Sequence, residues 1–274
     1  MRQVPVSIAV KGSGVSFGYA DKVAVDVSDF DIPFGKLTAV IGPNGSGKST
    51  LLNGIAGLLT PLTGTIELGG DSNRVAYVMQ STKVNEALPV SVREVVTMGR
   101  YANTGPYRRL QTADIDAVDS AMARLDITDL SNSQLGKLSG GQRQRVFVAQ
   151  GLAQDHDILL LDEPLTGIDI TTAMAIDEVI HEEMEEGCAV IITTHDLSEA
   201  QVADHVLLVD GRVLAEGPPG SVLTEENLRE AYGSTLLHVK AGGIFLDDPA
   251  HRPTDSRHQH QARVIHPEPD QLHD

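Results

Sequence analysis

A glycine-rich segment directly after a short apolar run constrains this chain more than any other feature. Residues 37–41, Leu-Thr-Ala-Val-Ile, have the composition of a buried strand, and residues 42–50 read Gly-Pro-Asn-Gly-Ser-Gly-Lys-Ser-Thr. Glycine takes positive φ at little cost, so Gly42, Gly45 and Gly47 are expected to turn the backbone and bring successive N–H groups together. Such a nest of N–H groups binds the β- and γ-phosphates of a nucleotide.

The two polar residues that follow supply the remaining parts of a phosphate site. Lys48 would place a positive charge between the phosphates, and the Ser49 hydroxyl is positioned to ligate Mg²⁺. The helix that begins at Lys48 directs the positive end of its dipole toward the same point. The segment therefore predicts a P-loop for a nucleoside triphosphate. The residues predicted to contact it are Gly42, Pro43, Asn44, Gly45, Ser46, Gly47, Lys48, Ser49 and Thr50.

Composition limits the class of protein. The chain has 274 residues, of which 41% are hydrophobic and 22% charged, as in an ordinary globular protein. Its longest apolar runs, such as residues 158–161, are far shorter than a membrane-spanning helix, and its first residues lack the apolar core of a signal peptide. The net charge of −17 argues against general nucleic-acid binding and against attraction to anionic lipid. Any membrane association is expected to come through a protein partner.

Strands alternate with helices along most of the chain, which is typical of a parallel sheet covered on both faces. Residues 8–34 differ, because short β-like runs separated by turns predict a small antiparallel sheet. Residues 91–130 show helical periodicity, which predicts a helical insertion. The expected fold is α/β: a P-loop NTPase with a mixed or parallel core sheet, an N-terminal antiparallel β subdomain and a helical subdomain at about 81–155.

Polar residues stand where three predicted strands end. The run 75–79 ends at Gln80, the run 158–161 at Asp162 and Glu163, and the run 188–193 shortly before His195. In open α/β sheets, ligands bind outside the carboxyl ends of the strands. These four side chains are therefore expected to surround one nucleotide, with one acid serving Mg²⁺ and the other serving water.

A second helix start carries two glycines. Residues 138–142 read Leu-Ser-Gly-Gly-Gln and open an apolar-faced helix, which indicates a second anion site. With the P-loop, Gln80, the acid pair and His195 in this order, residues 8–235 resemble the ATP-binding subunits of ABC transporters. The resemblance implies ATP hydrolysis by a head-to-tail dimer. Each ATP would lie between the P-loop of one copy and Ser139, Gly140, Gly141 and Gln142 of the other.

The resemblance also implies a role for each matching residue. Tyr19 corresponds to the aromatic residue that stacks on adenine, and Asp169 to the aspartate that links the two sites across the dimer. Asp162 would hold Mg²⁺ through water, with Ser49 and Gln80 as further ligands. Glu163 would polarise the attacking water, and His195 would contact the γ-phosphate. Lys48, Gln80, Glu163 and His195 are thus the expected catalytic set.

The segment after Gln80 bears on the transported substrate. Residues 90–101 and 107–109 resemble the corresponding part of manganese and zinc importers, where the helical subdomain receives the membrane permease. We place the docking surface near Arg100 and Tyr101. The resemblance implies a peripheral subunit on the cytoplasmic face of the membrane, working with a permease and an extracytoplasmic metal-binding protein. Two alternatives remain open: an ATPase of an iron-chelate or haem importer, and a soluble ABC ATPase outside transport.

The C-terminal composition changes after about residue 240. Residues 241–274 are rich in Pro, Asp, Gln and His, and we expect a tail without stable structure beyond an ATP-binding domain at 1–240. Its histidines could bind transition metal, but only His258 and His260 are closely spaced. The single cysteine, Cys188, is expected to be an inert core residue, and His156 an ordinary surface or edge residue.

Overall fold

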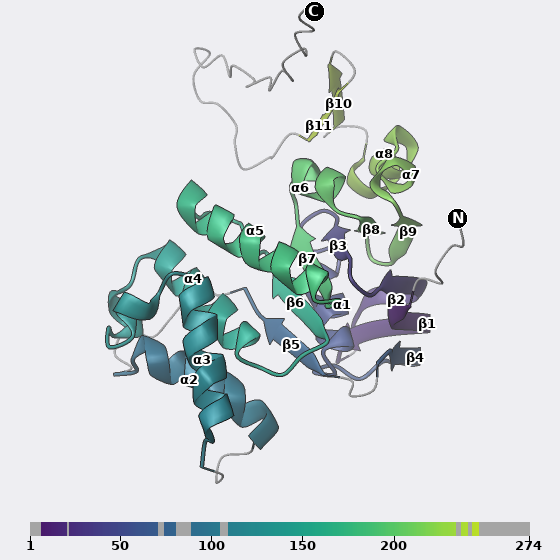
Figure 1. The fold of residues 1–274 in the computed structure, drawn as a ribbon. Coiled ribbons are helices and arrows are strands. Elements are labelled where there is room, and N and C mark those ends of the chain that lie inside the picture. The colour runs from purple at the N-terminus through teal and green to yellow at the C-terminus, as the bar shows by residue number, and fades with distance from the viewer. Residues whose placement is uncertain are drawn as a thin grey trace, which may run out of the picture.

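The structure is a computed structural model that describes residues 7–20, 22–70, 74–80, 89–104, 109–233, 237–240 and 243–246. Its centre is a six-stranded sheet in the order β5-β6-β7-β3-β8-β9 (Figure 1). Five strands are parallel: β5 (Val75–Val78), β6 (Ile158–Asp162), β7 (Ala189–Thr194), β3 (Leu37–Ile41) and β8 (His205–Val209). The edge strand β9 (Val213–Gly217) pairs antiparallel with β8. The mixed α/β core expected from the sequence is confirmed.

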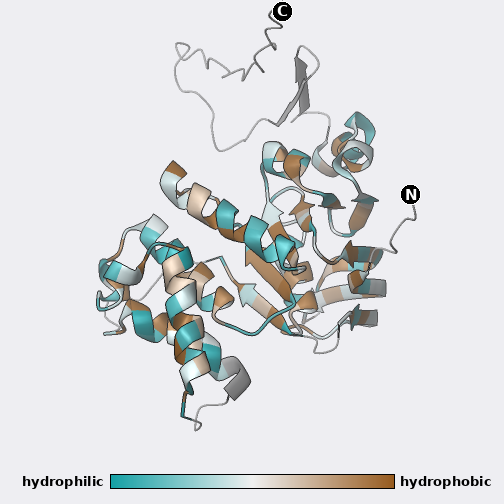
Figure 2. Ribbon diagram, viewed as in Figure 1, coloured by the Kyte–Doolittle hydropathy of each residue, from teal (hydrophilic) through white to brown (hydrophobic). Residues whose placement is uncertain are grey.

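Every residue of the three central strands β3, β6 and β7 is buried. This matches their continuous apolar sequences, because a parallel sheet is covered on both faces. Figure 2 shows hydrophobic residues concentrated on these strands. None of the described helices has the length and apolar composition needed to cross a bilayer.

A second, antiparallel sheet of three strands covers part of the core. Its order is β2-β1-β4, with β1 (Ile8–Tyr19), β2 (Lys22–Pro33) and β4 (Thr63–Leu68). The two long strands carry several register shifts, including one between Gly12 and Val15, which bend the ribbon around the core. The helix after the P-loop, α1 (Lys48–Ile55), packs against this sheet.

The helical insertion lies between β5 and β6 in the chain and forms a lobe beside the sheet (Figure 1). It contains α2 (Val92–Thr104), α3 (Thr112–Arg124), the short 3₁₀ turns η1 (Thr128–Leu130) and η2 (Leu135–Lys137), and α4 (Gly140–Leu152). These helices contact one another, and α4 also packs against α5 (Ile170–Glu185) and β5. The lobe is thereby joined to the core through the helix that begins at the Leu-Ser-Gly-Gly-Gln segment.

The remaining elements close the carboxyl-terminal side of the described chain. They are α6 (Leu197–Val202), α7 (Pro219–Val222), α8 (Glu225–Tyr232) and a hairpin of β10 (Leu237–Lys240) and β11 (Gly243–Leu246). Strand β11 lies in the segment expected to be without structure. That expectation was wrong for residues 243–246, because the apolar run Ile-Phe-Leu pairs with β10 in spite of its polar surroundings. The histidine-rich residues 247–274 lie outside the described part of the chain.

Candidate nucleotide site

The P-loop joins β3 to α1 in the strand-loop-helix context that the sequence predicts. Gly45 and Gly47 have φ values of 82° and 103°, so these two glycines take the left-handed conformation. Gly42 does not, and the sequence interpretation was wrong on this point. A Cβ at Gly42 would lie 1.9 Å from the carbonyl oxygen of Val209. Gly42 is therefore required by the close approach of β8 to the loop.

Lys48 points back into the loop. It is 7% exposed, and its Nζ donates hydrogen bonds to the carbonyl oxygens of Gly42 (2.8 Å) and Pro43 (3.1 Å). Burial lowers the pKa of Lys48, and the carboxylates of Glu163 and Asp162 act against this shift. The Lys48 cation is thus held at the loop, within electrostatic range of the two acids at the end of β6.

Ser49, Asp162 and Thr193 form a chain of oxygen atoms at the ends of α1, β6 and β7. The Ser49 hydroxyl donates to Oδ1 of Asp162 at 3.2 Å, and the Thr193 hydroxyl donates to the same oxygen at 2.5 Å. Hydroxyl and carboxylate oxygens are the ligands that Mg²⁺ prefers. The Ser49 and Asp162 oxygens therefore fit a magnesium ion, and the buried Thr193, which sequence reasoning missed, holds the Asp162 carboxylate in place.

Gln80 and Glu163 also meet, as the strand-end argument predicted. The side-chain amide of Gln80 donates to Oε2 of Glu163 at 2.7 Å. The backbone of Glu163 has φ of 49° and its N–H donates to the Thr193 hydroxyl at 2.8 Å. A left-handed conformation at a non-glycine residue is costly and is found preferentially at functional sites. Here it turns the Glu163 side chain off the end of β6.

His195 follows β7 and is exposed. Glu199 of α6 lies within electrostatic range of both His195 and Glu163. Burial raises the pKa of Glu199, with a partly opposing hydrogen bond from Thr194. Tyr77 of β5 is a further neighbour that the sequence did not reveal: burial raises its pKa, and the nearby Asp162 adds to the rise. In the sequence, the one indication of a role for Tyr77 was its place in the strand that leads to Gln80.

Tyr19 stands at the end of β1 with 52% of its surface exposed. Its hydroxyl accepts a hydrogen bond from the side-chain amide of Asn53 on α1 at 3.2 Å. An exposed ring next to the P-loop helix is available for stacking. The structure thus places Tyr19 beside the helix that follows the P-loop, and the Asn53 hydrogen bond fixes the hydroxyl end of its ring.

The Leu-Ser-Gly-Gly-Gln segment begins α4. Ser139 is the N-cap: its hydroxyl accepts from the N–H of Gln142, whose side-chain oxygen accepts from the N–H of Ser139. Such a reciprocal capping box leaves the helix N-terminus well ordered. Among the described residues, no hydrogen bond or ion pair joins residues 139–142 to residues 42–50. The two predicted anion sites of one chain are therefore separate.

Gly141 and Asp169 are in direct contact. A Cβ at Gly141 would lie 2.6 Å from the Thr172 hydroxyl and 2.7 Å from a carboxylate oxygen of Asp169. Asp169 caps α5 by accepting from the N–H and the hydroxyl of Thr172 at 3.0 and 2.9 Å. These hydrogen bonds lower the pKa of Asp169. The structure thus ties Asp169 to the start of α4 and not to the P-loop of the same chain.

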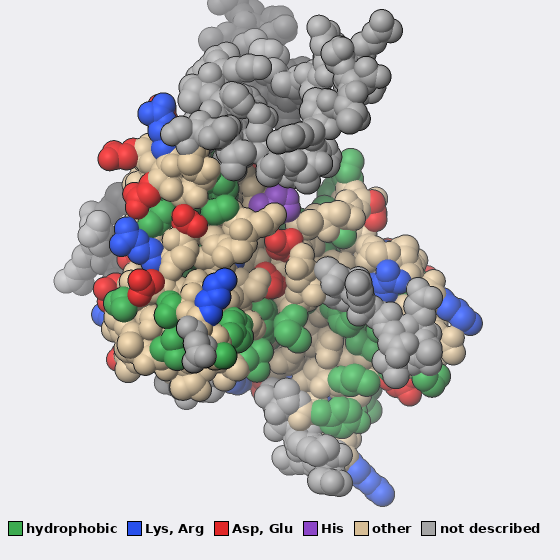
Figure 3. Space-filling model, turned by 180° about the vertical axis from the view of Figure 1, so that it is seen from behind, with side chains coloured by type: hydrophobic (Ala, Val, Ile, Leu, Met, Phe, Trp, Pro, Cys, Tyr) green, Lys and Arg blue, Asp and Glu red, His purple; other side chains and the backbone are tan. Residues whose placement is uncertain are grey.

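Sequence reasoning placed Arg100 and Tyr101 on the docking surface, but in the helical lobe only Tyr101 is exposed. Arg100 is 13% exposed; its guanidinium pairs with Asp114 of α3 at 2.8 Å and donates to the carbonyl oxygen of Ala153 at 2.8 Å. It holds α2 against its neighbours and is not a surface group. Exposed apolar side chains on α2 and α3 are Tyr101, Met98 and Ile115. Figure 3 shows hydrophobic side chains spread over the middle and lower parts of one face of the molecule, with polar and charged groups between them.

A comparison with known protein families identifies the family of this chain. Residues 25–166, more than half of the chain, match the family described as ABC transporter. This chain belongs to the ABC transporter family. As the ATP-binding subunit of such a transporter it is an ATPase, and subunits of this kind work as dimers on a membrane permease. The resemblance on which the sequence interpretation depended is confirmed.

Curated relatives of this ABC subunit match over most of its length. The manganese transport system ATP-binding protein MntB of Bacillus subtilis is 38% identical over 84% of the chain and 95% of the relative. The zinc transport system ATP-binding protein TroB of Treponema pallidum is 37% identical over 83% and 88%. The chelated iron transport system membrane protein YfeB of Yersinia pestis is 40% identical over 82% and 79%.

Solved structures agree with this ABC ATPase fold. A metal-chelate type ABC transporter in an inward-facing conformation superposes with a TM-score of 0.74 at 26% identity, covering 88% of this chain and 96% of that one. An ATP-binding cassette from another ABC transporter superposes with a TM-score of 0.71 at 22% identity, covering 82% and 98%. The second likeness concerns the fold alone.

Proposed function

We propose that this ATPase powers the import of a divalent transition metal, zinc or manganese, through a separate membrane permease at the cytoplasmic face. The observation that carries the proposal is the similarity over more than four-fifths of the chain to subunits named for manganese and zinc transport. An extracytoplasmic metal-binding protein would deliver the metal to the permease. The subunit itself would supply work, and the permease and binding protein would select the ion.

The nucleotide site supports this role with a complete set of side chains. When bound, ATP would supply the phosphoryl group and Mg²⁺ would offset the negative charge that develops on it. Ser49, Asp162 and Gln80 would hold the metal, and Lys48 and the P-loop amides would hold the phosphates. Glu163, held by Gln80 at 2.7 Å, would orient and polarise the attacking water, and His195 would contact the γ-phosphate. Positioning and electrostatic stabilisation are the main sources of catalysis in phosphoryl transfer.

The separation of the two anion sites within one chain supports a head-to-tail dimer. Ser139, Gly140, Gly141 and Gln142 make no described contact with the P-loop of their own chain, and a Cβ added at Gly140 would meet no other atom within 4 Å. The open surface at Gly140 would face the nucleotide of a second copy. Asp169, in contact with Gly141, would transmit the state of one site to the other.

An iron-chelate or haem importer is the second candidate. It is favoured by YfeB and by the ferric enterobactin transport protein FepC of Escherichia coli, which is 35% identical over 88% of this chain and 90% of the relative. A soluble ABC ATPase outside transport has no such support among these relatives.

Uptake by whole cells tests the proposal. A strain lacking this subunit should accumulate less radioactive zinc or manganese at low external concentration, and expression of the wild-type chain, but not of Glu163→Gln, should restore uptake. Ferric chelate and haem uptake are measured in parallel. Normal zinc and manganese uptake with a defect in ferric chelate or haem uptake would show that the second candidate is correct.

A further inference from the structure

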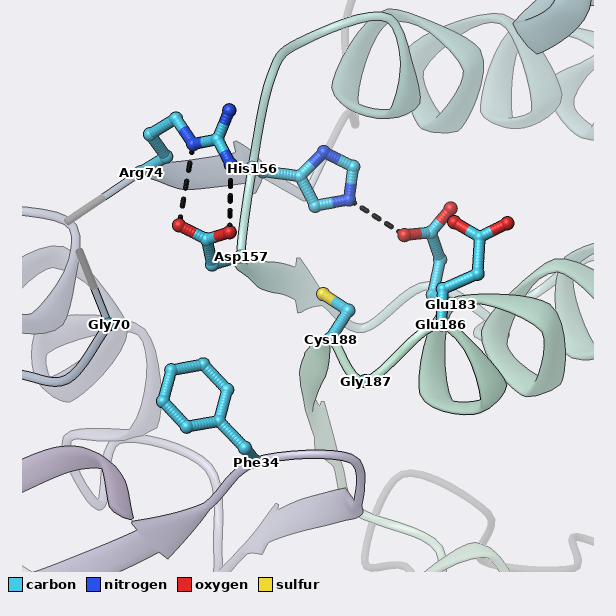
Figure 4. A pocket seen from close by; sticks show the side chains of 9 residues that line it. All are labelled: Phe34, Gly70, Arg74, His156, Asp157, Glu183, Glu186, Gly187 and Cys188. Carbon is cyan, nitrogen blue, oxygen red and sulfur yellow. Dashed lines mark hydrogen bonds and ion pairs between the residues drawn. The ribbon is translucent and has the colours of Figure 1, made fainter. Parts of the chain in front are cut away.

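Three side chains of different chemistry meet at the edge of the sheet opposite the nucleotide site. His156 precedes β6, Cys188 precedes β7, and Glu183 lies near the end of α5. Their ligand atoms, a ring nitrogen, the thiol sulfur and a carboxylate oxygen, all lie within 4.8 Å of one another. Figure 4 shows the three side chains converging from their separate elements. The sequence interpretation of His156 as an ordinary surface or edge residue holds for its place before β6 but not for its exposure, since its side chain is only 6% exposed.

The cluster lines an open cavity of about 350 Å³. Cys188 and Glu183 are buried, but both contribute to the wall of this cavity, which also includes Glu186. An ion could therefore reach the cluster from solvent, and water in the cavity could complete its coordination. Cys188 stands just outside β7, and its side chain lines the cavity.

Neighbouring groups orient two of the three ligand atoms. Nδ1 of His156 lies 2.8 Å from the carbonyl oxygen of Gln154, so this nitrogen carries a proton and Nε2 is directed toward Glu183 at 3.0 Å. The guanidinium of Arg124 binds the other carboxylate oxygen of Glu183 at 2.7 Å. A carbonyl behind the histidine and a partner behind the carboxylate are the supports that metal ligands in proteins usually have.

We propose that Nε2 of His156, Sγ of Cys188 and Oε2 of Glu183 form a binding site for a borderline-soft divalent cation, Zn²⁺. Tetrahedral Zn²⁺ with bonds of about 2.0–2.3 Å places its ligand atoms about 3.5 Å apart, so small side-chain rotations close the site. The thiolate and the imidazole disfavour Mg²⁺ and Mn²⁺, which prefer oxygen. A water molecule in the cavity takes the fourth position.

In the absence of metal, protons stabilise the cluster. Burial lowers the pKa of His156, but hydrogen bonds to Cys188 and Glu183 raise it to about 10. Burial acts to raise the pKa of Glu183, but the neighbouring imidazolium and the Arg124 guanidinium outweigh it and lower this pKa. Zinc binding replaces the protons on Nε2 and Sγ and releases them to solvent, and the cation then balances the carboxylate and thiolate.

The site is distinct from that of Mg·ATP. Strand β6 runs from the His156 end to Asp162, and β7 runs from the Cys188 end to Thr194, so the two sites lie at opposite ends of the same parallel strands. The inference therefore does not depend on which ion the transporter imports.

Cobalt(II) is the sharpest probe, because a cobalt–thiolate bond gives a near-ultraviolet charge-transfer band and Cys188 is the only cysteine of the chain. Reduced, metal-free, full-length protein is titrated with Co²⁺ without nucleotide. We expect the band, together with the visible absorption of tetrahedral cobalt, to saturate at one equivalent and to disappear when Zn²⁺ is added. Cys188→Ser should abolish the band, and His156→Gln should weaken Co²⁺ and Zn²⁺ binding by about tenfold or more, as judged from the effects of metal-site substitutions.

Two variants serve as controls. His181→Gln changes an exposed histidine of α5 and should leave the titration unchanged. Replacing His251, His258, His260, His266 and His273 with glutamine should leave the charge-transfer band intact, which separates the cluster from metal bound by the tail. Glu183 is left unchanged because it also holds Arg124. Absence of the band in protein whose thiol is shown to be free and reduced, or a band unaffected by His156→Gln, would overturn the proposal.

Discussion

The side-chain amide of Gln80 donates a 2.7 Å hydrogen bond to Oε2 of Glu163, joining the ends of two neighbouring parallel strands. Glu163 leaves β6 in a left-handed conformation, and Gln80 leaves β5 just before the helical lobe begins. The carboxylate assigned to the attacking water is therefore held by the segment that leads to the surface assigned to the permease.

The first prediction concerns Glu163. Glu163→Gln should bind ATP with near wild-type affinity, because the P-loop and Lys48 are unchanged, but hydrolysis in the assembled transporter should fall by about 10²-fold or more. Phosphate release and nucleotide binding are measured on the same preparation. Glu178→Gln on α5 is a matched control and should retain activity. If Glu163→Gln hydrolysed ATP at the wild-type rate, Glu163 could not be the residue that polarises the attacking water.

The two glycines of the signature segment should respond differently to alanine. In Gly141→Ala the new Cβ meets Thr172 and Asp169 at 2.6–2.7 Å, so the free energy of unfolding should fall by about 1–3 kcal/mol. Gly140→Ala meets nothing within 4 Å in the monomer and should change it by less than about 1 kcal/mol. Urea denaturation measures both.

Gly140→Ala also tests the composite site, because a stable protein should nevertheless lose ATP hydrolysis if Gly140 faces the nucleotide of a second copy. Full activity in this variant would contradict the composite site.

Crosslinking can test the head-to-tail dimer directly. Asn44 and Ser139 are exposed, and Cys188→Ser removes the native thiol. Cysteines at positions 44 and 139, in a chain that also carries Glu163→Gln, should form a disulfide between copies when Mg·ATP is added and not with ADP. Gel electrophoresis without reductant reports the dimer. If the yield is independent of nucleotide, the proposed sandwich is wrong.

Arg100 and Arg93 offer a matched pair on the same helix. Arg100 pairs with Asp114 at exposures of 13% and 8%, whereas Arg93 pairs with Asp119 at 43% and 51%. Removing one partner of a buried pair is costly, so Arg100→Ala should destabilise the protein by about 3 kcal/mol. Arg93→Ala should cost less than about 1 kcal/mol, because exposed pairs contribute little. Equal losses in urea denaturation would show that burial does not decide the difference.

Substitution of Tyr101 should affect the coupling of ATP hydrolysis to metal uptake and not the stability of the subunit. Tyr101→Ala together with Met98→Ala should leave ATP binding and stability of the isolated subunit nearly unchanged, since both side chains are exposed. Metal uptake should fall because the permease contact is weakened. Thr97→Ala is the control for a nearby change on α2. Undiminished uptake by the double variant would move the docking surface elsewhere.

Much of the nucleotide site could be predicted from the sequence because its parts are local or follow from strand order. The P-loop is one contiguous segment whose backbone chemistry is set by Gly45, Gly47 and Lys48. Asp162, Glu163 and Gln80 end parallel strands, and parallel strands bring their carboxyl ends to one edge. No measurement of distance was needed to expect these side chains to meet.

Other features depended on contacts between distant segments. The close approach of the Val209 carbonyl oxygen explains why residue 42 is glycine. The ion pair with Asp114 explains why Arg100 is buried and not a surface residue. His156, Glu183 and Cys188 have no metal-ligand spacing in the sequence, because His156 precedes β6 and is separated from the other two by the whole of that strand and most of α5. Only the pairing of β6 with β7 and the packing of α5 against β7 bring the imidazole, carboxylate and thiol to one cavity. Periodicity and motifs describe each element by itself, whereas the side chains that meet between elements are decided by how the elements pack.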